Sequence, residues 1–267
     1  IANTNLKSSE IDLVILATLT PDCFFPSTAA LIIDKLGLEV ANGYDTGAAC
    51  SGFIYGIDDA CCRLWAGGPY KDRWRKIVVC SSEIMSSTLN AFDYRTGLLF
   101  GDAASAVLIE RGDVESSGFK INNTLTKMVK DHVGEVYFKS PFGLQSGEKW
   151  DDQKFELDGR NVYRHAVDLI VEFLREYQEK FNLNLEEVDY FIPHQANARM
   201  LDEIGNKLNI TDRMLTNIEL VGNTAGCSIP LCFDEFNSKG QFKKGDRVIF
   251  VSLGAGYTLG IVDITKL

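Results

Sequence analysis

The feature of this sequence that most constrains its fold is an internal repeat. Glu-Ile-Asp-Leu at residues 10–13 returns as Glu-Val-Asp-Tyr at residues 187–190, which is 177 positions later. Ala-Cys-Ser at 49–51 returns as Gly-Cys-Ser at 226–228 with the same offset. Both copies read as strand, helix, glycine-rich turn, helix and strand. The chain is therefore predicted to be a duplicated α/β unit, whose equivalent turns meet near a pseudo-two-fold axis.

Hydrophobic periodicity places the main elements of each half. Continuous apolar runs at residues 11–17, 78–81 and 248–252 predict buried strands in a sheet covered on both faces. Helices are predicted at residues 26–37 and at residues 158–181. The predicted organisation is an N-terminal half at 1–114, connecting strands and loops at 115–157, and a C-terminal half at 158–267.

Composition limits the partners and the compartment. The net charge of −10 argues against nucleic-acid binding, and no apolar run approaches the ~20 residues that cross a membrane. The seven cysteines form no Cys-x-x-Cys pair, which predicts free thiols in a reducing, cytoplasmic setting without zinc. No signal peptide is visible, and the chain starts at Ile1, so we expect the true N-terminus to lie upstream.

The first candidate for chemistry is the turn around Cys50. A strand is predicted to end near Asp45, small residues follow, and a helix is predicted to begin at Cys50. A thiol at a helix N-terminus feels the positive end of the helix dipole, which can lower a cysteine pKa to ~3.5–7.5. The Cys50 backbone N–H is also a free first-turn donor for an oxyanion. The alternative is a small buried thiol that packs the turn.

The second candidate is His194. An apolar strand ends at Pro193, and ligands of α/β sheets bind beyond the carboxyl ends of the strands. The other histidines, His132 and His165, lie in a polar loop and beside an apolar helix stripe, and we expect them to be structural.

Two glycine-rich turns complete the set of candidates. Gly-Asn-Thr at residues 222–224 alone indicates a simple turn, but it occupies in the second half the place that the Cys50 turn has in the first. Gly-Ala-Gly at residues 254–256 follows a buried strand. It is either a plain turn or the source of a second oxyanion-hole amide.

Taken in order, these segments resemble one family. Gly-Ala-Ala-Cys-Ser-Gly-Phe at 47–53, Pro-His-Gln-Ala-Asn at 193–197 and Gly-Asn-Thr at 222–224 are similar to motifs of the β-ketoacyl-acyl-carrier-protein synthase III family. Phe-Gly-Asp-Ala-Ala-Ser-Ala at 100–106 is similar to the family's Phe-Gly-Asp-Gly-Ala-Gly-Ala. The resemblance runs from about Asp12 to the C-terminus. It implies the thiolase-like duplicated α/β fold, layered α-β-α-β-α.

The resemblance also implies a reaction. Cys50 would be the nucleophile that takes an acyl group from acyl-CoA, with His194 and Asn223 completing the triad. The backbone amides of Cys50 and Ala255 would form the oxyanion hole. Decarboxylation of malonyl-acyl carrier protein would supply the attacking carbanion, giving the β-ketoacyl thioester that initiates fatty acid synthesis. No metal or redox cofactor is implied.

Further positions are carried over from the family. Phe25 matches a residue that reaches the acyl pocket of the partner subunit, which implies a homodimer. Three residues match positions that bind the substrate along the pantetheine arm: Gly159, Tyr163 and Asn197. Three basic residues are candidates for carrier-protein docking or, equally, for solvated helix faces: Arg164, Arg199 and Lys207.

The sequence departs from the family in places, and alternatives stay open. Nothing matches the family's first strand–helix unit, whose Trp and Arg hold the CoA nucleotide, so that unit is expected to be missing. Ala-Gly-Cys at 225–227 replaces the usual Ser-Ala-Ala. A thiolase is disfavoured because Ser252 stands where its second cysteine would be. A specialised synthase for a polyketide, lipid or signal molecule and a non-catalytic carrier-protein-binding subunit remain alternatives.

Overall fold

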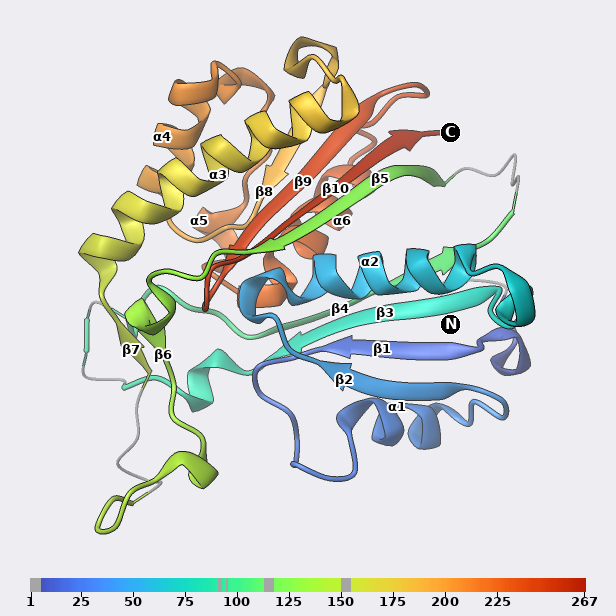
Figure 1. The fold of residues 1–267 in the computed structure, drawn as a ribbon, viewed down its shortest axis with the longest axis horizontal. Helices are drawn as coiled ribbons and strands as arrows, with labels where there is room; N and C mark the ends of the chain where they lie inside the picture. The colour runs from blue at the N-terminus through green and yellow to red at the C-terminus, as the bar shows by residue number, and fades with distance from the viewer. Residues whose placement is uncertain (1–5, 91–92, 95, 113–117, 150–154) are drawn as a thin grey trace.

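The strands form two main sheets in a computed structural model that describes residues 6–90, 93–94, 96–112, 118–149 and 155–267 (Figure 1). The first sheet has the order β2-β1-β3-β4 and contains β1 (Leu13–Ala17), β2 (Asn42–Thr46), β3 (Lys76–Glu83) and β4 (Ala103–Glu110). The second has the order β5-β10-β9-β8 and contains β5 (Phe119–Met128), β8 (Tyr190–Pro193), β9 (Arg247–Gly254) and β10 (Thr258–Lys266). A small sheet pairs β6 (Val136–Tyr137) with β7 (Glu156–Leu157).

The helices cover and separate these sheets. They are α1 (Thr28–Leu36), α2 (Gly52–Trp65), α3 (Gly159–Phe181), α4 (Ala198–Leu208), the short α5 (Ile218–Val221) and α6 (Ser228–Ser238). Figure 1 shows α2 between the two main sheets, α1 on the outer face of the first sheet, and α3 with α4 on the outer face of the second. This is the five-layered arrangement that the family resemblance implies.

Three apolar clusters correspond to these layers. The central cluster joins α2 and α6 to both sheets, through residues such as Ile54, Ile229, Val79 and Val262. A second cluster packs α3 and α4 on the second sheet, and a third packs α1 on the first. Because each fully buried aliphatic side chain contributes about 1.5–3 kcal/mol, the central cluster holds the two halves together as one body.

The duplication is visible in matching contacts. Leu13 of β1 pairs with Ile77 of β3, and Tyr190 of β8 pairs with Val248 of β9, in parallel register. Asp12 accepts a hydrogen bond from the Lys76 amide at 2.9 Å, and Asp189 accepts one from the Arg247 amide at 2.8 Å. The repeated Glu-x-Asp segments therefore do the same work in both halves, where each aspartate secures the start of the neighbouring strand.

The equivalent turns of the two halves are 176 residues apart in the structure, one fewer than the 177 that the repeated letters indicate. The 3₁₀ turns η2 (Ala49–Ser51) and η10 (Ala225–Cys227) both begin with an alanine in the left-handed region, at φ 48° and φ 47°. Cys50 therefore corresponds to Gly226, and the predicted pairing of Cys50 with Cys227 is wrong by one position. The repeated Cys-Ser letters mislead because the chain between strand and turn is one residue shorter in the second half.

Element boundaries follow the local signals closely. The helix predicted at 26–37 is α1, where Ser27 is the N-cap that accepts the Ala30 N–H and Gly37 ends the helix at φ 61°. The helix predicted at 158–181 is α3, capped by Asp158. β5 lies in the predicted connecting segment yet pairs with β10 of the second sheet. The predicted boundary between residues 114 and 115 lies outside the described residues, and the three-part division stays a prediction.

Helix length also bears on membranes. Within the described ranges, none of the helices combines the length and the apolar character that a bilayer-spanning segment requires.

We predict that the buried carboxylate of Asp263 makes the second sheet sensitive to loss of its partner. Asp263 is 0% exposed and accepts hydrogen bonds from Arg247 and from Tyr177. Arg247→Met would leave this charge unpaired and should lower the free energy of unfolding by about 3 kcal/mol in chemical denaturation. In the exposed Arg111–Asp72 pair, Arg111→Met should cost less than about 1 kcal/mol. Equal losses in the two variants would contradict this assignment.

Candidate active site

One pocket of about 230 Å³ collects the predicted triad from three distant segments. Cys50 comes from η2, His194 follows β8, and Asn223 precedes η10, and all three line this pocket. Most of the other lining side chains are apolar, among them Leu19, Met85, Leu99, Phe100, Phe155, Val162 and Met200. A mostly apolar wall excludes water and strengthens the electrostatic effect of the few polar groups inside it.

The nucleophile turn is held by the C-terminal half of the chain. The Ser51 hydroxyl donates to the Thr258 carbonyl at 2.7 Å, and Thr258 Oγ1 donates to the Ala48 carbonyl at 2.9 Å. Ser252 Oγ donates to Ser51 Oγ at 2.9 Å, and both serines are fully buried. These bonds connect the residues on either side of Cys50 to β9 and β10, so its position depends on both halves.

Two backbone amides face the Cys50 sulfur. The amides of Cys50 itself and of Ala255 lie close enough to the sulfur to lower the pKa of the thiol, because the end of β9 packs directly on the turn. A Cβ on Gly254 would lie 2.9 Å from the Cys50 nitrogen, so only glycine permits this approach. The Gly-Ala-Gly segment therefore packs its backbone on the Cys50 turn, and its role as the source of an oxyanion-hole amide stays a prediction.

The acidity of Cys50 differs from the expectation. Burial, followed by the negative charge of Glu83, raises the pKa of the thiol to about 12, although the two amides act in the opposite direction. The low thiol pKa predicted for a helix N-terminus is therefore wrong for Cys50. η2 and its surroundings desolvate the sulfur, and this desolvation outweighs the favourable dipole.

His194 is held at the end of β8 in a neutral form. Its backbone N–H donates to the Val251 carbonyl at 2.8 Å, and the residue is 6% exposed. Burial lowers the pKa of the imidazole to about 4, so the ring is uncharged at neutral pH. Its Nδ1 atom has no hydrogen-bond partner, which leaves the ring free to present either a lone pair or an N–H to a ligand.

Asn223 is fixed by its backbone and by its own side-chain oxygen. Its N–H donates to the Leu99 carbonyl at 2.8 Å, and its carbonyl accepts the Gly101 N–H at 3.0 Å. The Oδ1 atom accepts the Ala225 amide at 2.9 Å. Nδ2 makes just a long contact of 3.4 Å with the Ala196 carbonyl. The carboxamide is therefore oriented with Nδ2 as the group available to donate.

The substrate-binding residues predicted by the resemblance divide into two groups. Gly159, Tyr163 and Asn197 line the same pocket as the triad. Phe25 does not line it, and its side chain is 84% exposed on the surface. A single chain therefore assembles the pocket without this aromatic.

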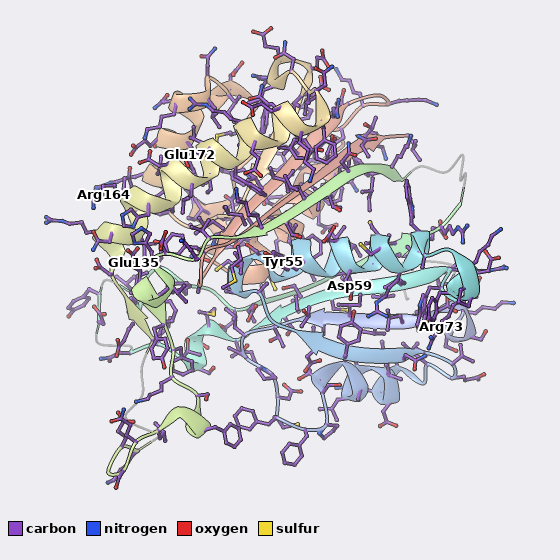
Figure 2. All side chains as sticks on the ribbon, in the orientation of Figure 1. Tyr55, Asp59, Arg73, Glu135, Arg164 and Glu172 are labelled. Atoms are coloured by element: carbon purple, nitrogen blue, oxygen red, sulfur yellow. The ribbon has the colours of Figure 1, made fainter. Side chains whose placement is uncertain are left out.

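The predicted docking residues lie on the exposed sides of α3 and α4. Arg164 and Arg199 are exposed, and Figure 2 labels Arg164 on α3, at the same end of the molecule as Glu135. Lys207 is paired with Asp168 at 2.7 Å and with Glu203 at 3.5 Å. This pairing favours the interpretation of Lys207 as part of a solvated helix face.

In the described part of the chain, one cluster groups three side chains that could ligate a metal. The ligating atoms of His132, Glu135 and His165 lie within 4.8 Å of one another. The two imidazole rings stack with their centroids 3.9 Å apart, and the Nδ1 atoms of both rings lie 3.0 Å from Glu135 Oε1, as hydrogen-bonding partners of that carboxylate. Glu135 also accepts a hydrogen bond from Tyr257. The geometry fits two imidazoles sharing one carboxylate better than the convergent ligands of zinc.

Sequence reasoning missed Glu83, the last residue of β3. It is 1% exposed and lies close enough to raise the pKa of Cys50. The sequence does contain a signal for this residue. Glu83 is the carboxylate that ends an apolar strand, and ligands bind beyond the carboxyl ends of such strands.

Comparisons with known proteins find one family along the chain. The model of the 3-oxoacyl-[acyl-carrier-protein] synthase III family matches residues 44–127, and the model of its C-terminal part matches residues 178–265. A beta-ketoacyl-[acyl-carrier-protein] synthase III of Clostridium acetobutylicum is 35% identical over 263 residues, covering 97% of this chain and 78% of that protein. The corresponding protein of Solibacter usitatus is 36% identical over 262 residues, covering 96% and 77%.

Solved structures give the same result. The 3-oxoacyl-[acyl-carrier-protein] synthase III from Aquifex aeolicus VF5 superposes with a TM-score of 0.85 at 34% identity, covering 98% of this chain and 79% of that chain. The priming beta-ketosynthase from the R1128 polyketide biosynthetic pathway superposes with a TM-score of 0.86 at 27% identity, covering 98% and 76%.

The duplicated five-layered body, with a cysteine turn at the start of its central helix, defines a condensing enzyme of the thiolase fold, a class of acyltransferases. The length and identity of the matches show that the chain belongs to the β-ketoacyl-[acyl-carrier-protein] synthase III family.

We predict that Gly254→Ala disables the nucleophile without unfolding the protein. The added Cβ would lie 2.7 Å from the Ala48 carbonyl and 2.9 Å from the Cys50 nitrogen, so the turn must move. Single-turnover acylation should slow at least tenfold, with an overpacking cost of about 1–3 kcal/mol in unfolding. Gly134→Ala, whose Cβ would meet open space, is the control. Acylation of the Gly254 variant at the wild-type rate would show that this contact does not position Cys50.

Proposed function

We propose that this chain transfers an acyl group from acyl-CoA to Cys50 and condenses it with malonyl-acyl carrier protein, which initiates fatty acid synthesis. One observation carries the proposal: Cys50, His194 and Asn223 line a single apolar pocket, and two backbone amides face the sulfur. The relatives that bear the synthase name supply the substrate classes.

In the first step the thiol must lose its proton while it attacks. The pKa of Cys50 is near 12 and that of His194 near 4, so transfer to the imidazole before attack is strongly unfavourable. The thiol proton therefore passes to the departing CoA sulfur as the carbon–sulfur bond forms. The tetrahedral oxyanion accepts hydrogen bonds from the Cys50 and Ala255 amides. The bond to the CoA sulfur then breaks, and CoA leaves with the proton.

In the second step a malonyl thioester loses carbon dioxide, and the electron pair moves onto the thioester as an enolate. The enolate oxygen accepts hydrogen bonds from His194 Nε2–H and from Asn223 Nδ2–H. A neutral imidazole suits this role because it holds its proton as a donor across neutral pH. The enolate carbon attacks the acyl carbonyl, and the Cys50 sulfur departs from the β-ketoacyl product.

Two further features are part of the proposal. Three large aromatic side chains, Phe24, Phe25 and Phe142, are 60%, 84% and 78% exposed, and such surfaces support association. We infer a homodimer that covers Phe25, as the family resemblance implies. The cysteines of the described ranges are all free thiols, which supports the cytoplasmic location.

The variants of the triad should separate the two steps. Cys50→Ala should gain no acyl mass from acyl-CoA, because the nucleophilic sulfur is absent. His194→Ala and Asn223→Ala should still become acylated, yet release carbon dioxide from malonyl-acyl carrier protein at least about a hundredfold more slowly, since each removes one donor to the enolate. Intact-protein mass spectrometry and measurement of released carbon dioxide report the two steps separately.

Condensation at the wild-type rate in either donor variant would refute its role. Absence of any acyl mass on the wild-type protein would favour the non-catalytic carrier-binding alternative. A panel of acyl-CoA primers distinguishes fatty acid initiation from a specialised synthase, because the latter would extend a primer other than a simple short acyl group.

A further inference from the structure

The buried carboxyl group of Glu83 lies in the first half at the position that Gly254 has in the second half. Leu13 pairs with Ile77 in the first half, and Tyr190 pairs with Val248 in the second. Glu83 lies six residues after Ile77 at the end of β3, and Gly254 lies six residues after Val248 at the end of β9. The two residues therefore correspond.

The contacts of these two residues are also equivalent. Gly254 packs on the backbone of Cys50, and Glu83 packs on Gly226, the counterpart of Cys50. A Cβ on Gly226 would lie 3.1 Å from Glu83 Oε1 and 3.7 Å from the Ala49 carbonyl. One glycine therefore separates the carboxyl group of Glu83 from the residue that precedes the nucleophile.

The carboxyl group has few compensating partners. Glu83 is 1% exposed, and its Oε2 accepts the Leu19 N–H at 3.0 Å, while its Oε1 makes no hydrogen bond of good geometry. The Gly226 amide and the Thr20 hydroxyl lie close enough to lower the pKa of the carboxyl group, but burial outweighs them. In the ion pairs found among the described residues, no lysine, arginine or histidine contacts it. Leu19 lines the pocket, so Glu83 lies directly behind the pocket wall.

The groups around Glu83 are mostly uncharged. The segment after β1 presents the Leu19 amide and the Thr20 hydroxyl, while η2 presents the Cys50 thiol. η10 presents the Cys227 thiol. Asp102, ahead of β4, is exposed and accepts hydrogen bonds from Ser86.

Electrostatics follows from this placement. Burial raises the pKa of Glu83 to about 7, so the group changes charge near neutral pH. Its negative charge in turn raises the pKa of both the Cys50 and the Cys227 thiols. Cys227 is fully buried, so Cys50 is the thiol through which this charge can affect the pocket.

We propose that Glu83 is a positioning residue for the nucleophile: its buried carboxyl group, which Gly226 alone separates from the Cys50 turn, tunes the reactivity of the thiol, and neutralising that group makes the thiol more reactive. The proposal deepens the proposed function, on which it rests for the reaction that the thiol performs. The carboxyl group acts through Cys50 and touches no reacting atom.

The test is alkylation of Cys50 by iodoacetamide as a function of pH, followed by peptide mass spectrometry that separates the seven cysteines. Glu83→Gln keeps an oxygen for the Leu19 amide and removes the charge. The pH of half-maximal alkylation should fall by about one unit. At pH 8 the rate should rise about threefold, since a tenfold gain in thiolate is partly offset by its lower nucleophilicity. Glu110→Gln should leave the profile unchanged, because Glu110 is exposed and lies at the end of β4 opposite to Ala103, the residue that pairs with Glu83.

The unmodified protein provides a second measurement that needs no variant to fold. Below pH 7 the logarithm of the Cys50 alkylation rate should rise in step with pH. As Glu83 ionises, the curve should rise less steeply, because the new negative charge offsets part of the gain in thiolate, and the full slope should return at higher pH. A rise of constant slope, or a Glu83→Gln profile identical to that of the wild type, would overturn the proposal.

Failure of this inference and failure of the proposed function give different results. Alkylation requires neither acyl-CoA nor carrier protein, so a pH shift without acyl transfer would retain the role of Glu83 and reject the condensing reaction. Acyl transfer with an unshifted alkylation profile would retain the condensing reaction and reject the role of Glu83.

Discussion

The active site depends on the packing of the end of β9 against the turn that carries Cys50. Gly254 lies so close to the Cys50 nitrogen that a single methyl group would not fit, and this contact aims the Ala255 amide at the sulfur. Ser51, Ser252 and Thr258 reinforce it with buried hydrogen bonds. Neither half of the duplicated fold contains the site alone. The pocket exists because α2 and α6 hold the two sheets together in one core.

The same packing makes the site neutral at rest. Burial keeps the Cys50 thiol protonated and the His194 imidazole uncharged, so neither group enters the reaction as an ion. In a pocket with mostly apolar walls, charge is stabilised where amides and carboxamides are already aimed. This fits a reaction in which negative charge appears briefly on one oxygen and then on another. The negative charge that Glu83 gains near neutral pH lies behind the pocket wall. It acts against the formation of negative charge on the Cys50 sulfur.

Much of this site could be predicted from sequence because Cys50 and His194 lie just beyond the carboxyl ends of β2 and β8, where a parallel sheet brings its loops together, and because Asn223 lies in the turn of the second half that matches the Cys50 turn. The helix caps at Ser27 and Gly37, and the strand at β9, follow from local rules. The acidity of Cys50 could not be predicted, since desolvation depends on what packs over the turn and not on the turn itself. Glu83 was missed for the same reason, and the one-residue shift between Cys50 and Gly226 is visible only in backbone conformation.

The most direct measurement is a crystal structure of the protein after reaction with an acyl-CoA. The account predicts an acyl thioester on the Cys50 sulfur, with its carbonyl oxygen between the amides of Cys50 and Ala255 and with His194 and Asn223 beside the vacant part of the pocket. An acyl group on another cysteine, or a thioester oxygen turned away from both amides, would contradict it.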